Sequence, residues 1–285
     1  VLEGMQHHLS DAKALEANGI IAKGERLYAE VHTAEAEREL LKAQKTVETL
    51  YSALSNTLGG DESTYIPATS MFILSDIENV SYFKDLAKQH SPLLKQVGYK
   101  KQLATENMRL QRADFAPQVA LTGMAAFYNY QVSPIIPKWA VGAGVSLKIF
   151  DGLNREYKFS AAKSQIRQVE AVGHQAESDI LTLIDKLYNE MVTYSQQLPS
   201  VNASGRFAEE YLRIKEEAFK EGAAPSSDVV DARLNLAKIR IERLQAAYYY
   251  DMMLARLLEA CGQSELFPDY GKRAAAMPIR YEHDF

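Results

Sequence analysis

The sequence predicts a mainly α-helical chain that carries one inserted β-hairpin and an internal duplication. Three observations support this fold class. Long stretches place apolar residues three or four positions apart, two stretches between residues 117 and 149 alternate apolar with small or polar residues, and two 41-residue segments match without a gap. The expected helices are longer than those of ordinary globular domains, which favours a coiled-coil-like or tubular assembly of antiparallel helices.

The duplication relates residues 19–59 to residues 222–262 at an offset of 203 positions. Both segments begin and end with glycine, a residue that often ends a helix because it adopts a positive φ without strain. We therefore interpret the segments as two copies of one helical hairpin. The identical pairs are Gly19/Gly222, Ala29/Ala232, Ala34/Ala237, Glu39/Glu242, Leu41/Leu244, Ala43/Ala246, Leu54/Leu257 and Gly59/Gly262.

Residues 1–58 predict the end of the first helical hairpin, with its turn near Gly19. One helix reaches residue 18 and a second covers residues 25–58, each with apolar residues on one side. Residues 59–82 contain glycine, proline and a short apolar run, so we expect a small irregular segment. A third helix is predicted over about 83–112, within a segment 83–116 that ends before Pro117.

Residues 117–150 predict a β-hairpin, because their alternation gives one apolar face and one small or polar face. Four aromatic residues gather toward its outer end. They fit a membrane-interface belt, and ordinary strand propensity is the alternative explanation. These residues are Phe127, Tyr128, Tyr130 and Trp139.

Residues 151–262 predict the second long helical hairpin, with its turn near Gly222. The first helix runs from Leu153 to Glu221 with a local interruption at Pro199. Ser226 or Ser227 is expected to cap the next helix, which runs to Leu258. Residues 263–285 contain two prolines and a glycine and predict a second irregular segment.

The composition is that of a folded protein without a basic surface. Hydrophobic residues make up 47% of the 285 residues and charged residues 24%, and the net charge of −5 is spread along the chain. This balance argues against nucleic-acid binding. No run of 18 apolar residues occurs, which excludes a transmembrane helix in the sequence, whereas a transmembrane strand needs only about 10 alternating residues.

Patterns typical of enzymes and metal sites are not found in the sequence. The six histidines are scattered, and the adjacent His7 and His8 cannot share a helix face. No nucleophile–base pair, phosphate-binding loop or pair of catalytic carboxylates stands out, so we expect no enzyme, no cofactor and no metal site. Cys261 is the only cysteine, which excludes an intrachain disulfide.

Three motifs resemble signatures of the TolC family of outer-membrane efflux channels. Residues 147–152, Leu-Lys-Ile-Phe-Asp-Gly, are similar to the strand-end signature Pro-Leu-Phe-Asp-Gly-Gly, with Lys148 in place of proline and Leu153 in place of the second glycine. Residues 112–117, Arg-Ala-Asp-Phe-Ala-Pro, resemble the Ala-Arg-Ala-x-x-Leu-Pro entry into the preceding strand. Gly222 with residues 228–232, Asp-Val-Val-Asp-Ala, is similar to the helical-tip pattern Gly-x5-Asp-Val-Leu-x-Ala.

The resemblance implies a homotrimer in the outer membrane of a Gram-negative bacterium, with most of the chain in the periplasm. Each protomer would give strands to a shared β-barrel in outer-membrane lipid and long helices to an α-barrel. Residues 59–82 and 263–285 would form an equatorial belt. The implied partners are a periplasmic adaptor (membrane fusion) protein and an inner-membrane efflux or secretion transporter. The implied function is a passive exit duct of a tripartite efflux or type I secretion system, gated at its periplasmic helical tip.

The resemblance also implies two sets of tip residues. Gly19, Ile20, Gly222 and Ala223 would form the adaptor-docking tip, although a glycine that ends a helix needs no such role. Asp228 and Asp231 match acidic rings at the constriction, and three copies of them would attract cations. Glu25 is the first-copy counterpart of Asp228, Tyr28 replaces the second acid, and Ala224 stands where related channels carry a locking arginine.

The two copies differ in what precedes their glycines. About 139 residues separate Tyr82 from Gly222, whereas 18 residues precede Gly19. We therefore expect that the chain lacks about 120 N-terminal residues of its family, including a first strand hairpin. The alternative function is a periplasmic adaptor-like or structural coiled-coil protein without channel activity. Such adaptors have one hairpin between lipoyl-like half-domains, so two hairpins around a strand pair favour the channel.

Overall fold

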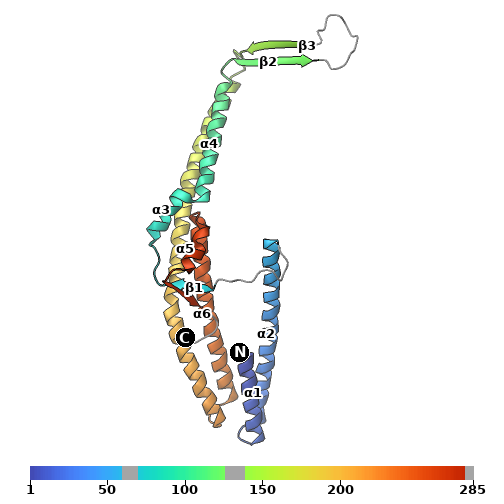
Figure 1. The fold of residues 1–285 in the computed structure, drawn as a ribbon, viewed down its shortest axis with the longest axis vertical. Helices are drawn as coiled ribbons and strands as arrows, with labels where there is room; N and C mark the ends of the chain where they lie inside the picture. Colours follow the sequence, from blue (N-terminus) through green and yellow to red (C-terminus); the bar gives the residue numbers. More distant parts are fainter. Residues whose placement is uncertain (60–69, 126–138, 280–285) are drawn as a thin grey trace, which may run out of the picture. The chain divides into compact units, whose positions relative to one another are not determined.

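The computed structural model describes residues 1–59, 70–125 and 139–279 (Figure 1). The contacts divide the chain into two compact units. The first unit contains the described residues of Val1–Val80, Asp185–Glu259 and Gln263–Phe285, and the second contains those of Ser81–Ile184 and Ala260–Gly262. The mainly helical fold class predicted from the sequence is confirmed, because long helices account for most of the described residues.

The first helical hairpin lies wholly in the first unit. It consists of α1 (Leu2–Ala17) and α2 (Lys23–Leu58), antiparallel to one another in Figure 1. Gly19 has φ +71°, and the N–H groups of Gly19 and Ile20 donate to the carbonyls of Glu16 and Leu15. This is the Schellman arrangement, which satisfies the last carbonyls of a helix and needs a positive φ.

The second helical hairpin consists of α5 (Asn154–Lys220), 67 residues long, and α6 (Ser226–Ala260). Helix α5 continues through Pro199, whose ring nitrogen removes one hydrogen bond without ending the helix. Gly222 has φ +72° and repeats the turn of the first hairpin, with Ala223 N–H donating to the carbonyl of Ala218. A cluster of buried side chains joins the two hairpins within the first unit: Ala12, Ala29, Phe219 and Val229.

The prediction of one helix over residues 83–112 is wrong, because the structure has two. Helix α3 (Val80–His90) and helix α4 (Pro92–Ala113) are separated by Ser91, whose ψ of 124° is extended. The proline at residue 92 explains the break, since it disfavours helical geometry in the residue before it and suits the first position of a new helix.

The predicted β-hairpin is present among the described residues. Strands β2 (Gln118–Ala125) and β3 (Trp139–Ser146) pair antiparallel, with Val119 opposite Val145 and Ala125 opposite Trp139 (Figure 1). Both faces are open, and the side chains of Leu121 and Trp139 are 80% and 71% exposed. Three of the four predicted interface aromatics, Phe127, Tyr128 and Tyr130, lie outside the described residues.

The two segments predicted to be irregular contain a strand each, and these strands pair with one another. Strand β1 (Met71–Leu74) lies antiparallel to β4 (Ala276–Ile279), and the one-turn η1 (Ser264–Leu266) and α7 (Phe267–Gly271) precede β4. Three of the four β1 residues, Phe72, Ile73 and Leu74, are buried, with Ile73 at 1% exposure. The pairing was not predicted, because each run is only four residues long and its partner is distant in the chain.

A second connection holds this sheet region together. The Glu78 carboxylate accepts hydrogen bonds from the Tyr270 hydroxyl at 3.2 Å and from the Arg273 guanidinium, whose Cζ lies 3.6 Å from the Tyr270 ring centre. Burial alone would raise the pKa of Glu78, but its hydrogen bonds to Arg273 hold that pKa below its ordinary value. The segments 59–82 and 263–285, predicted as one equatorial belt, are thus tied together where they are described.

The turn that leads from β3 into α5 contains a strained residue. Gly152 has φ +71° and Leu153 has φ +66°, and Leu153 is the only residue other than glycine with a positive φ among the described residues. The left-handed conformation costs a β-carbon about 1–2 kcal/mol. A second glycine at this position, as in the signature that the sequence resembles, would remove that cost.

Leu153→Gly is expected to raise the free energy of unfolding by about 0.5–1 kcal/mol, since relief of strain exceeds the added freedom of the unfolded chain. The Leu153 side chain is half exposed, so little packing is lost. Urea titration followed by circular dichroism measures the change. Gly152→Ala is the matched control: it places a β-carbon at φ +71° and is expected to have the opposite sign. A lower free energy of unfolding for Leu153→Gly than for the wild type would contradict the inference that Leu153 is strained.

Candidate functional site at the paired helix turns

The two helix turns predicted as a docking tip lie close together within the first unit. A β-carbon added at Gly222 would meet the Ile20 side chain at 3.1 Å, whereas one at Gly19 would meet nothing within 4 Å. All four predicted tip residues are exposed, and Ile20 is 51% exposed despite its apolar side chain. The structure therefore brings the two turns together at Ile20 and Gly222, and their neighbours Gly19 and Ala223 are exposed.

Glu25 caps the helix that follows the second turn. Its carboxylate accepts a hydrogen bond of 2.6 Å from the Ser226 backbone N–H, the first residue of α6. An acceptor with negative charge is favoured there, because the first N–H groups of a helix have no partner within it. The prediction that Ser226 or Ser227 caps α6 is therefore wrong, since both lie inside the helix and the capping carboxylate comes from α2.

The hydroxyl of Ser226 is used in a second contact. Its Oγ lies 2.6 Å from Nε2 of His8 on α1, and both side chains are buried. The His8 ring packs against the Phe219 ring with 4.6 Å between centres. Burial lowers the pKa of His8 to about 4, and the positive charge of Arg233 lowers it further than the opposing charge of Asp11 raises it. Ser226 thus contacts both helices of the first hairpin.

Asp228 lies in the first turn of α6, as predicted, and is paired. Its carboxylate accepts a 2.6 Å hydrogen bond from Lys215 of α5, whose ammonium also lies 5.4 Å from the centre of the Tyr211 ring. The bond to Asp228 raises the pKa of Lys215. Asp231 is exposed one turn farther along α6. Of the three predicted constriction acids, Glu25 and Asp228 therefore have partners within the first unit.

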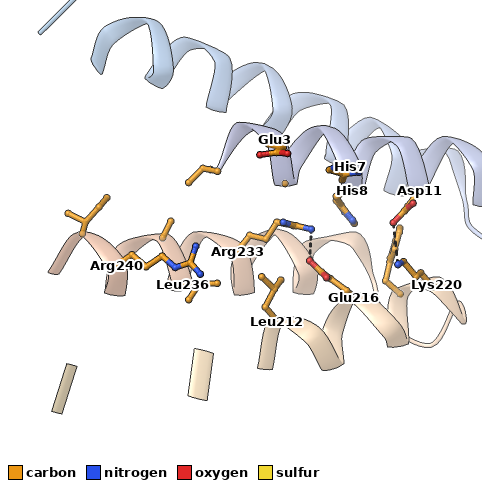
Figure 2. Close-up of a pocket in the computed structure, with 15 residues that line it drawn as sticks. Glu3, His7, His8, Asp11, Leu212, Glu216, Lys220, Arg233, Leu236 and Arg240 are labelled. Carbon is orange, nitrogen blue, oxygen red and sulfur yellow. Dashed lines mark ion pairs between the residues drawn. The ribbon is translucent and has the colours of Figure 1, made fainter. Parts of the chain in front are cut away.

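A groove of about 780 Å³ lies beside the buried His8 side chain and is lined by α1, α5 and α6 (Figure 2). Arg233 forms an ion pair with Glu216, and Lys220 lies 3.9 Å from Asp11. The Arg233 guanidinium also lies against the backbone at Gly4, where a β-carbon would overlap it. The groove is thus lined by paired charges together with apolar side chains that include Phe219, Leu212 and Leu236.

Sequence reasoning found the acids and glycines but not their partners. The partners His8, Lys215 and Arg233 are not predicted from the sequence. One signal was available, because Glu25 and Ser226 each lie within a few residues of the matching glycines Gly19 and Gly222. No signal for the His8 contact existed, since its partner is 218 residues away.

Two negative findings apply to the part of the chain that the structure describes. None of its helices combines the length and the apolar character needed to cross a membrane. Within the same residues, no three histidine, cysteine, aspartate or glutamate side chains gather as a metal site.

Comparison with known proteins gave one family and several similar structures. A family model described as outer membrane efflux protein matches residues 84–263. The comparison with curated proteins gave no match.

The similar solved structures share the fold at low sequence identity. The outer membrane protein VceC of Vibrio cholerae is 19% identical with a TM-score of 0.70, and the match covers 92% of this chain and 65% of that one. The open MtrE outer membrane channel of Neisseria gonorrhoeae is 18% identical with a TM-score of 0.71, covering 92% and 62%. The CmeC outer membrane channel of Campylobacter jejuni is 17% identical with a TM-score of 0.70, covering 96% and 60%. This chain thus spans 60–65% of the length of these proteins.

Proposed function

Because the chain belongs to the outer membrane efflux protein family, we propose that it is the channel component of a tripartite efflux or type I secretion system. In this proposal it forms a passive trimeric exit duct, gated at the paired helix turns, with no enzymatic activity. The observation that carries the proposal is the meeting of two helical hairpins at matching glycine turns. An adaptor-like or structural coiled-coil protein would need neither this meeting nor an exposed apolar strand pair.

The geometry of the four repeat glycines supports the internal duplication. Gly19 and Gly222, which begin the copies, have φ of +71° and +72°. Gly59 and Gly262, which end them, have φ of +73° and +70°. Four residues at matching positions thus share a conformation that other residues rarely adopt.

The exposed strand pair supports a place in outer-membrane lipid. Apolar side chains of β2 and β3 are open to the surroundings, among them Val119 at 71% and Val141 at 75% exposure. A two-stranded pair with unpaired edges is not stable alone, so it needs further strands beside it. We propose that copies of the chain supply such strands to a shared barrel, with Trp139 at the membrane interface.

The arrangement at the turns supports a gate and a docking surface. Asp228, Asp231 and Glu25 are proposed to face the constriction, and Gly19, Ile20, Gly222 and Ala223 to contact a periplasmic adaptor. Lys215 offsets the charge of Asp228 in the described conformation. An inner-membrane transporter would supply the energy, and residues 59–82 and 263–285 would form the belt. The long helices would lie in the periplasm.

Single-channel conductance of the full-length protein in planar bilayers tests this function. The wild type is expected to conduct with a preference for cations, because carboxylates in a narrow passage attract them. The double variant Asp228→Asn/Asp231→Asn is expected to lose that preference. The control Glu242→Gln/Glu259→Gln removes two exposed charges from the same helix and should keep it. Unchanged selectivity would reject the acidic gate, and absence of channels would reject the duct.

A further inference from the structure

We propose that His8, Ser226 and Glu25 form an acid-sensitive clasp, which holds the first helical hairpin on the N-terminus of α6 and releases it when His8 takes up a proton. Its consequence for gating rests on the proposed function above, whereas the clasp itself does not. Release would loosen the paired turns without any partner protein.

The geometry of the clasp centres on one residue. The Ser226 side chain is fully buried, its Oγ lies 2.6 Å from Nε2 of His8, and its N–H donates to Glu25 at 2.6 Å. The first contact holds α1 and the second holds α2. Both helices of the first hairpin are therefore attached to the same residue of α6, two positions before the proposed gate residue Asp228.

The surroundings of His8 favour its neutral form. His8 is only 3% exposed and its ring packs on Phe219. A charged imidazolium would therefore lose most of its hydration there. Arg233 of α6 carries a positive charge that would repel a protonated His8. Its guanidinium forms an ion pair with Glu216 (Figure 2) and occupies the space that a β-carbon at residue 4 would fill. The other charged or titratable groups that face this region are Glu3, His7 and Asp11 on α1, Glu25 on α2, Lys220 on α5, and Arg240 on α6.

The direction of the pH effect follows from these surroundings. In the clasp the pKa of His8 is lowered from 6.5 to about 4, so the proton binds more tightly to the released hairpin than to the held one. The ratio of held to released molecules is therefore highest above pH 6.5. Below that pH the ratio falls about tenfold for each pH unit. Between pH 6.5 and 4 the ratio is expected to fall on the order of 100-fold.

The test measures the distance between the two hairpins in the full-length protein. Spin labels are placed at the exposed Lys13→Cys and Glu221→Cys in a Cys261→Ser background, and labelled chains are diluted with unlabelled ones. We expect the distribution of distances between the labels to have one short distance at pH 7.5. Below pH 6 a second, longer and broader set of distances should grow. His8→Gln cannot be charged and should remove the pH dependence, while the control His7→Gln should keep it. The clasp would be overturned if the label distances of the wild type did not depend on pH, or if those of His8→Gln did.

Arg233→Gln provides a second test if His8→Gln is already released at pH 7.5. Without the like charge of Arg233, a protonated His8 is less unfavourable in the held form, so the midpoint of release should move to lower pH. A purely structural contact would not move this midpoint, so an unchanged midpoint would overturn the proposal. Conductance separates the two proposals. Acid release without channels rejects the duct and keeps the clasp, and channels without acid release reject the clasp alone.

Discussion

Gly262→Ala is expected to lower the free energy of unfolding by about 3 kcal/mol or more, the largest effect predicted for this chain. Gly262 has φ +70°, which strains any residue with a β-carbon by about 1–2 kcal/mol. The added atom would also overlap the backbone carbonyl of His90, at the end of α3, and would meet Pro92 at 3.1 Å. Backbone atoms cannot move aside as a flexible side chain does, so overpacking adds a further 1–3 kcal/mol.

The matched glycine of the first copy gives a control for this prediction. Gly59 has φ +73°, but a β-carbon there would meet nothing within 4 Å. Gly59→Ala is therefore expected to cost only the strain, about 1–2 kcal/mol. Urea titrations of both variants, followed by circular dichroism, measure the difference. Equal losses would show that the close approach of His90 to Gly262 contributes nothing.

Asp251→Asn is expected to stabilise the protein by about 2 kcal/mol at pH 8. The Asp251 carboxylate accepts a 3.2 Å hydrogen bond from the Phe72 N–H of β1, while its Oδ1 is buried without a hydrogen-bond partner among the described residues. Burial raises the pKa of Asp251 from 3.8 to about 7. Three pKa units correspond to about 4 kcal/mol, which we halve because solvent reaches part of the group. Asparagine keeps the hydrogen-bond acceptor and removes the charge.

The sign of this effect gives it a characteristic pH dependence. The folded protein holds the proton of Asp251 more tightly than the unfolded chain, so stability falls as the pH rises from about 4 to 7. The gain from Asp251→Asn should therefore be full above pH 7 and vanish near pH 4. Thermal unfolding across this range measures it. Glu259→Gln, an exposed acid on the same helix, should gain little at any pH, and a pH-independent gain for Asp251→Asn would contradict the assignment.

Local signals in the sequence were sufficient for the long helices and the strand hairpin. The three-to-four spacing of apolar residues predicted α5 to within one residue at each end, because a helix that buries one face repeats its pattern over many turns. Gly19 and Gly222 were predicted as turns for a similarly local reason, since their positive φ depends on the glycine itself. The break at Ser91-Pro92 also has a local signal, because proline disfavours helical geometry in the residue before it.

Contacts between distant segments could not be predicted in this way. The His8–Ser226 contact and the Lys215–Asp228 pair depend on how one helix faces another, which no spacing within a single helix specifies. Asp228 was predicted as an acid of a constriction, and its lysine partner within the same unit was not predicted. Leu153 is a mixed case: the departure from a Gly-Gly signature was visible, but its strain became clear only from φ.

The pairing of β1 with β4 has a consequence for the order in which the chain folds. Ser75, next to β1, donates to the carbonyl of Ala275, 200 residues later in the chain. Closing such a long loop is slow. During synthesis β1 remains an unpaired apolar strand until nearly all of the described chain has been made. The edge is a site for wrong pairing during that interval. Folding of this region therefore depends on how well β1 is protected from wrong pairing before its partner strand, Ala276–Ile279, has been synthesised.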